Sequence, residues 1–131
     1  MHTFKYLLKT GSKLFAAILL AASIGSQANA QDAAAKEATL TGEVLDLSCY
    51  VKSGAKGPEH KSCATGCLKN GNPIGLLASD GKVYLVVEDH KNADPYKELK
   101  NHPAEQVKLT GTLQNRNGLP GIVLAKMELT K

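Results

Sequence analysis

The 131-residue chain contains no tryptophan and lacks the short motifs that mark many catalytic sites. It has no glycine-rich phosphate loop, no candidate set of serine, histidine and aspartate, and no paired carboxylate signature. The sequence Cys-x-x-Cys-His, which attaches haem covalently, is also absent. These absences argue against nucleotide-hydrolysing enzymes, serine hydrolases and c-type cytochromes, and we expect a protein that is not an enzyme.

No apolar run in the chain is long enough to span a bilayer. The longest run, residues 14–24, has about half the length that a membrane helix needs. Three lysines precede it: Lys5, Lys9 and Lys13. Small residues follow at Ala28 and Ala30, which completes the pattern of a secretory signal peptide over residues 1–30. We therefore expect cleavage after Ala30 and a periplasmic or secreted mature chain, residues 31–131, with no membrane span.

This mature chain would be almost neutral and poor in aromatic side chains. Of 16 lysines and arginines, three fall in residues 1–30, which leaves 13 basic residues against 12 acidic ones. A near-neutral surface does not attract polyanions. The only aromatic residues after position 30 are Tyr50, Tyr84 and Tyr96, too few to stack single-stranded bases. We expect a monomer with no nucleic-acid partner, and we leave a protein partner open.

All three cysteines and one histidine lie within a segment of nineteen residues: Cys49, His60, Cys63 and Cys67. Three thiolates and an imidazole can hold one soft or borderline metal ion in a tetrahedral site. Exported thiols oxidise readily, and an odd number leaves one of them without a disulfide partner. Metal ligation uses all three cysteines. A structural disulfide with a spare cysteine and a redox-active pair of Cys63 and Cys67 remain as alternatives.

The ligand set suits two metals. A closed shell of three cysteines and one histidine would hold zinc as a structural ion, because no position is left for substrate or water. Thiolates and imidazole also suit Cu(I), and a carrier would need a more open site. We expect one Zn²⁺ or Cu(I) per chain. Asp46, three residues before Cys49, has two interpretations: a carboxylate that orients His60, or a hydrogen-bonded residue at a strand end.

Alternating apolar and polar residues predict a small, mainly β domain. Residues 31–38 are small and polar and predict a flexible leader, followed by a domain over residues 39–131. A short helix is expected over residues 58–65, and another from Asp94 until Pro103 stops it. The expected strands are residues 39–47, 74–79, 82–88, 107–114 and 120–130. Five strands with a helix between the third and fourth predict an OB-like barrel, with the cysteines in an insertion after the first strand.

Individual positions predict local structure. Gly42 is expected to supply a bulge in the first strand. Gly66 is expected to end the first helix in a left-handed conformation and to turn Cys67 back toward the other ligands. Asp80 and Gly81 predict a two-residue turn in which both have positive φ. One face of the last strand is expected to carry Val123, Ala125, Met127 and Leu129.

Residues 41–49 contain the pattern Gly-x-Val-x-Asp-x-x-Cys, and residues 60–67 contain His-x-x-Cys-x-x-x-Cys. Gly71, residues 80–85 and residues 107–111 follow later in the chain. In these features the chain resembles an uncharacterised family of small exported bacterial domains with OB-like strands. The resemblance covers about residues 39–129. It implies the fold and a shared cysteine site, and it implies no activity.

The sequence thus predicts an exported OB-like domain that binds one metal ion and is not an enzyme. The ion would be a structural zinc or a Cu(I) ion that the protein handles, and its ligands would be Cys49, His60, Cys63 and Cys67. Two alternatives remain open. One is a disulfide-stapled module that binds a protein or a glycan through the barrel, and the other is a periplasmic thiol-redox protein.

Overall fold

The computed structural model describes residues 35–130. The predicted signal peptide with its cleavage site, and residues 31–34 of the predicted leader, lie outside the described residues. Along the described chain the strands and helices are β1 (Lys36–Asp46), α1 (Leu47–Ser53), the 3-10 helix η1 (Pro58–His60), α2 (Lys61–Lys69), β2 (Ile74–Ala78), β3 (Val83–Glu88), α3 (Asp94–Leu99), β4 (Gln106–Arg116) and β5 (Leu119–Leu129). Over this part of the chain, each helix is too short or too polar to cross a membrane.

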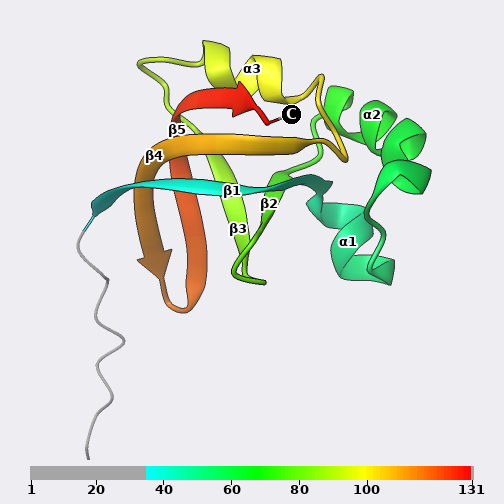
Figure 1. Cartoon of the computed structure of the whole chain (residues 1–131), viewed down its shortest axis with the longest axis horizontal. Helices are drawn as coiled ribbons and strands as arrows, with labels where there is room; N and C mark the ends of the chain where they lie inside the picture. The colour runs from blue at the N-terminus through cyan, green and yellow to red at the C-terminus, as the bar shows by residue number, and fades with distance from the viewer. Residues whose placement is uncertain (1–34, 131) are drawn as a thin grey trace, which may run out of the picture.

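The five strands close into a barrel (Figure 1). The order around it is β1-β2-β3-β5-β4, and β4 pairs with β1 to complete the ring. Neighbouring strands are antiparallel except β3 and β5, which run parallel. The helix α3 follows β3 and precedes β4. The predicted mainly β, OB-like barrel of five strands, with one short helix between the third and fourth, is confirmed.

Aliphatic side chains fill the barrel. Leu76, Leu109 and Ile122 are completely buried in a core whose one aromatic member is Tyr84. Two helices add fully buried leucines, Leu68 from α2 and Leu99 from α3. Burying a leucine side chain stabilises a fold by about 1.5–3 kcal/mol. The core therefore fixes α2, which lies in the insertion after β1, firmly against the barrel.

The first strand differs from its prediction in two ways. It begins at Lys36, and residues 36–38 of the predicted leader pair with β4. Gly42 forms no bulge, because it pairs in regular register with both β2 and β4. A Cβ at Gly42 would lie 2.2 Å from the carbonyl oxygen of Leu77. Glycine is required there because the neighbouring strand approaches too closely for a side chain.

The bulge of this barrel lies between β4 and β5. The register shifts between Thr110 and Gly111 of β4, and Ala125 of β5 is left without a partner. Leu124 is fully buried and Met127 also packs against the core, although strict alternation would put them on opposite faces. The prediction of one continuous face over residues 123–129 is wrong, because the extra residue inverts the alternation.

The turn between β2 and β3 also differs from its prediction. Gly81 has φ 82°, but Asp80 does not have positive φ. The N–H of Ala78 donates to the carbonyl oxygen of Lys82 at 2.9 Å, so three residues lie between this last hydrogen-bonded pair of the hairpin. The predicted two-residue turn is wrong here. Such a turn joins β4 to β5 instead, where Asn117 and Gly118 have φ 51° and 86°.

Candidate metal centre

Cys49 lies on α1, a seven-residue helix that was not predicted from the sequence. Asp46 caps the helix, since its Oδ1 accepts a hydrogen bond from the N–H of Ser48 at 3.0 Å. Gly54 ends it in the left-handed conformation, φ 72°, and donates to the carbonyl oxygen of Tyr50. Aspartate before a helix and glycine after it are recognisable signals. The sequence predicted a strand up to residue 47 and no helix before residue 58, so α1 corrects that prediction.

Cys63 and Cys67 lie together on α2, which is longer than predicted. The prediction that Gly66 ends this helix is wrong. The left-handed residue is Gly71, with φ 98°, and the N–H groups of Gly71 and Asn72 close the helix end with the two hydrogen bonds of a Schellman motif. The two cysteines are four residues apart on one helix and therefore share a face.

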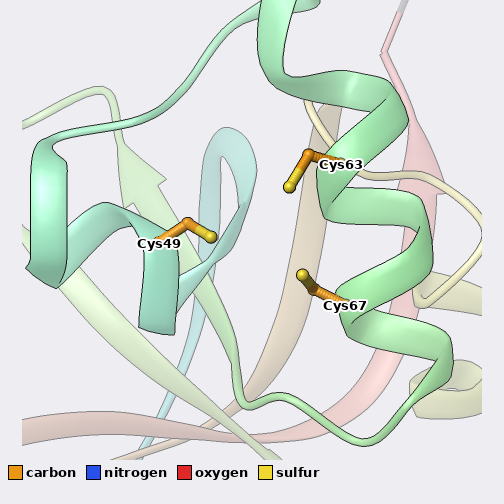
Figure 2. Close-up of side chains that lie close together, drawn as sticks. All are labelled: Cys49, Cys63 and Cys67. Atoms are coloured by element: carbon orange, nitrogen blue, oxygen red, sulfur yellow. The ribbon is translucent and has the colours of Figure 1, made fainter.

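The three cysteine side chains converge between the two helices, as Figure 2 shows. Cys49 points from α1 toward α2, and Cys63 and Cys67 point back toward it. All three are free thiols, and they lie 4.1–4.3 Å apart. The centre of a triangle with such edges is about 2.4 Å from each corner, close to the Zn–S bond length of about 2.3 Å. The cluster therefore has nearly the dimensions of a three-thiolate coordination site.

His60 stands beside a different set of donors. One donor atom each from Asp46, Cys49 and His60 lies within 4.8 Å of the other two. Asp46 is only 1% exposed. Its Oδ2 and the Nε2 of His60 are buried and have no hydrogen-bond partner. The structure thus divides the four predicted ligands: the three cysteines form one set, and His60 joins Cys49 and Asp46 in another.

The carboxylate of Asp46 connects the two helices. Its Oδ1 accepts hydrogen bonds from Ser48, before Cys49, and from the Nδ2 of Asn72, after α2, at 3.2 Å. Burial acts to raise the pKa of Asp46, but contacts with the Cys49 thiol, Asn72, the Cys67 thiol and Ser48 outweigh burial and lower it. A thiol is a weak donor, so Oδ2 still lacks a full hydrogen bond.

The Asp46 carboxylate also raises the pKa of two of the thiols. Its hydrogen-bonding contact, followed by burial and by nearby negative charge, raises the pKa of Cys49 to about 12. Contact with Asp46, followed by burial, also raises the pKa of Cys67. With no cation beside them these thiols stay protonated at neutral pH. A metal ion among the sulfurs would reverse the balance, because a coordinated thiol loses its proton.

Contacts outside the cluster hold the insertion on the barrel. The carboxylate of Glu43 on β1 accepts a hydrogen bond from the N–H of Gly57. Lys61, at the start of α2, forms a 2.6 Å ion pair with Glu105, just before β4. The side chain of Leu47 packs so closely on β2 that a Cβ at Gly75 would lie 2.6 Å from it. Both helices therefore also contact the barrel through residues outside the cysteine cluster.

A separate cavity of about 380 Å³ shares no residue with the cysteine cluster. It is lined by residues of β1, β3, β4, β5 and the turns that follow β2 and β4: Lys36, Lys82, Tyr84, Leu113, Gln114, Asn115, Gly118 and Pro120. No cysteine, histidine or carboxylate lines it, so it offers no metal ligands of those kinds.

Comparison of the chain with protein-family models, curated proteins and solved structures found no match in any of the three. The fold and the site therefore define the class of the protein by themselves. It is a small OB-like barrel that carries a three-cysteine cluster between two helices of the β1–β2 connection, and this cluster fits metal binding.

Proposed function

We propose that this protein is an exported metal-binding protein whose three cysteines take a thiophilic ion, with Zn²⁺ as the first candidate. The observation that carries the proposal is the convergence of three free thiols, 4.1–4.3 Å apart, from two separate helices. Export rests on the signal-peptide pattern of residues 1–30.

Metal binding uses all three thiols, whereas the alternatives use two. A disulfide between any two of Cys49, Cys63 and Cys67 would leave a third thiol beside it. A redox-active pair of Cys63 and Cys67 needs a thiolate nucleophile, and contact with Asp46 raises the pKa of the Cys67 thiol, which disfavours that thiolate. Binding of one cation by all three sulfurs leaves no spare thiol and needs no thiolate nucleophile.

Zinc at this place would stabilise the insertion. No residue of the helix α1 is fully buried, so apart from Leu47 it has little packing of its own. A shared ion would join Cys49 on α1 to Cys63 and Cys67 on α2, which Leu68 fixes to the core. Such a site resembles structural zinc sites, in which metal binding adds directly to folding stability.

Handling of Cu(I) is the second candidate, and one observation favours it. Cys63 is exposed, while Cys49 and Cys67 are half-buried, so one side of the sulfur triangle faces solvent. Three thiolates without a fourth protein sulfur suit Cu(I), and an exposed ligand allows the ion to be passed on.

The test is the metal content of the purified, reduced protein after exposure to Zn²⁺ or Cu(I) and removal of free ion. We expect at least one ion per chain. Cys63→Ser should weaken binding at least 10-fold, and Ser62→Ala, on an exposed neighbour in α2, should leave it unchanged. Three free thiols, or one disulfide and one thiol, in a protein that retains no metal would overturn the proposal.

A further inference from the structure

Two sets of metal-ligand atoms meet at one cysteine. The first set is Cys49, Cys63 and Cys67, and the second is Asp46, Cys49 and His60. In each set the donor atoms lie within 4.8 Å of one another, and Cys49 belongs to both. A single ion bound by the three cysteines would use only one of these sets.

The second set contains two polar atoms that the protein itself does not satisfy. Asp46 is 1% exposed, and its Oδ2 has no hydrogen-bond partner. The Nε2 of His60 is buried and also has none. Buried polar atoms without partners are rare in folded proteins and call for a ligand, a water or an ion. A carboxylate, an imidazole and a thiolate are together a normal ligand set for zinc.

The charge of the cluster points to the same conclusion. Three thiolates and the Asp46 carboxylate carry four negative charges, and one divalent ion neutralises only two of them. Lys61, at the start of α2, is paired with Glu105. Leaving two negative charges uncompensated beside a nearly buried carboxylate is costly. A second divalent ion brings the cluster to neutrality with His60 uncharged.

We propose that the centre holds two Zn²⁺ ions bridged by the thiolate of Cys49. The outer ion is bound by Cys63 and Cys67, and the inner ion by Asp46 and His60. This arrangement rests on the proposed function, and it adds a second ion and two ligands to it. The three thiol protons leave to solvent as the S–metal bonds form, so loading two ions releases three protons per chain.

Titration with Co²⁺, a spectroscopic substitute for Zn²⁺, tests the proposal on the purified, reduced protein. We expect saturation at two equivalents, with sulfur-to-cobalt charge-transfer absorption. The paramagnetic resonance signal of the first Co²⁺ should weaken as the second binds, because a shared thiolate couples the two ions magnetically. Competition with Zn²⁺ should release both cobalt ions.

Two kinds of variant separate the two positions. Asp46→Asn and His60→Gln should each reduce the stoichiometry from two ions to one and keep the three-thiolate absorption. Asparagine still caps α1, so the loss would not reflect a lost helix. Cys63→Ser should also leave one ion, but with weaker charge-transfer absorption. His90→Gln changes an exposed histidine elsewhere and should leave both ions bound.

The remaining outcomes distinguish this proposal from the proposed function. One ion per chain that survives His60→Gln and is lost in Cys63→Ser would overturn the two-ion centre and leave metal binding intact. One ion lost in both variants would mean a single four-ligand site, which also overturns it. No bound ion in the unmodified protein would overturn the proposed function as well.

Discussion

His102 lies between two glutamates just after α3. Its Nδ1 is 2.9 Å from the Oε2 of Glu105, and its Nε2 is 3.0 Å from the Oε1 of Glu98. Burial acts to lower the pKa of His102, but the two carboxylates outweigh it and raise that pKa. The pKa of Glu98 is lowered first by His102, and that of Glu105 first by Lys61 and then by His102. The two glutamates therefore favour the charged form of His102.

We expect this group to stabilise the protein in mildly acidic solution. A histidine with a raised pKa in the folded state contributes fully below its unfolded pKa, about 6.5, and loses the contribution as the pH rises through the folded pKa. The glutamates stay ionised in that range because their pKa values are lowered. His102→Gln should cost a few tenths to about 1 kcal/mol more at about pH 5.5 than at about pH 9.

Urea unfolding of His102→Gln and the unmodified protein at the two pH values measures this difference. His90→Gln provides the control, since His90 is exposed and should show no such dependence. A cost of equal size at both pH values would mean that His102 contributes by packing and not by charge.

Asp46 shows how far single residues could be predicted. Its place three residues before Cys49 indicated either an orienting partner of His60 or a strand-end residue. In the structure it caps α1, binds Asn72 and lies beside two thiols. The contact with Asn72 joins residues 26 positions apart, which no local pattern reveals. The nearness of the three cysteines was easier to predict, because all of them fall in one short segment.

At the scale of elements, α2 gives opposite predictions for two glycines. Gly66 lies inside the helix without positive φ, and a Cβ there would meet nothing within 4 Å. Gly66→Ala should therefore raise the free energy of unfolding by about 0.5–1 kcal/mol. Gly71 has φ 98°, a conformation that disfavours side chains. Gly71→Ala should lower the free energy of unfolding by about 1–2 kcal/mol.

Urea unfolding of both variants, reduced and with a chelator present, isolates the backbone effect from metal binding. Both variants add the same methyl group to one helix or its end, so Gly66→Ala and Gly71→Ala serve as controls for each other. Loss of stability in Gly66→Ala would mean that the helix ends there, as the sequence alone predicted.

The strands were more predictable than the helices of the insertion. Alternation and turn residues placed all five strands, because each signal is local to its strand. The bulge at Ala125 was not predictable, since it depends on how β5 meets β4. The helix α1 was not predicted because it is only seven residues long, has no fully buried residue and shows no apolar periodicity.

At the scale of the whole molecule, the barrel depends on pairings between distant segments. β1 pairs with β4, and β3 pairs with β5 in parallel. The order of elements predicted this architecture only by analogy with OB-type barrels. The division of the ligands into two sets has the same origin, because the position of His60 relative to Cys49 depends on how both helices dock on the closed barrel.

The signal peptide is expected to be removed during export. Ala28 and Ala30 provide the small residues that signal peptidase requires, so export should remove residues 1–30. Mass spectrometry of the periplasmic or secreted protein should find its amino terminus at Gln31. A bulky substitution such as Ala30→Leu should block cleavage, with Ala33→Leu as the control. A full-length, membrane-retained form of the unmodified chain would contradict the prediction.

The final prediction concerns how much of the molecule the metal centre orders. The segment from residue 50 to residue 72 buries few side chains, of which Ala64 and Leu68 are the main ones. The strands have their own core and their own ladder of backbone hydrogen bonds. Amide exchange should therefore become fast within residues 50–72 when a chelator is added under reducing conditions, while β2 to β5 stay protected.

Hydrogen exchange read by mass spectrometry, with and without chelator, resolves these regions. Cys49→Ser with no chelator should reproduce the pattern, and Ser48→Ala, beside it on α1, should not. Unchanged exchange in residues 50–72 would mean that Leu68 and the ion pair of Lys61 with Glu105 hold the insertion unaided. Fast exchange throughout the barrel would mean that the ion supports the entire fold. Either result would contradict a locally acting centre, since a local staple changes exchange only in the segment that it closes.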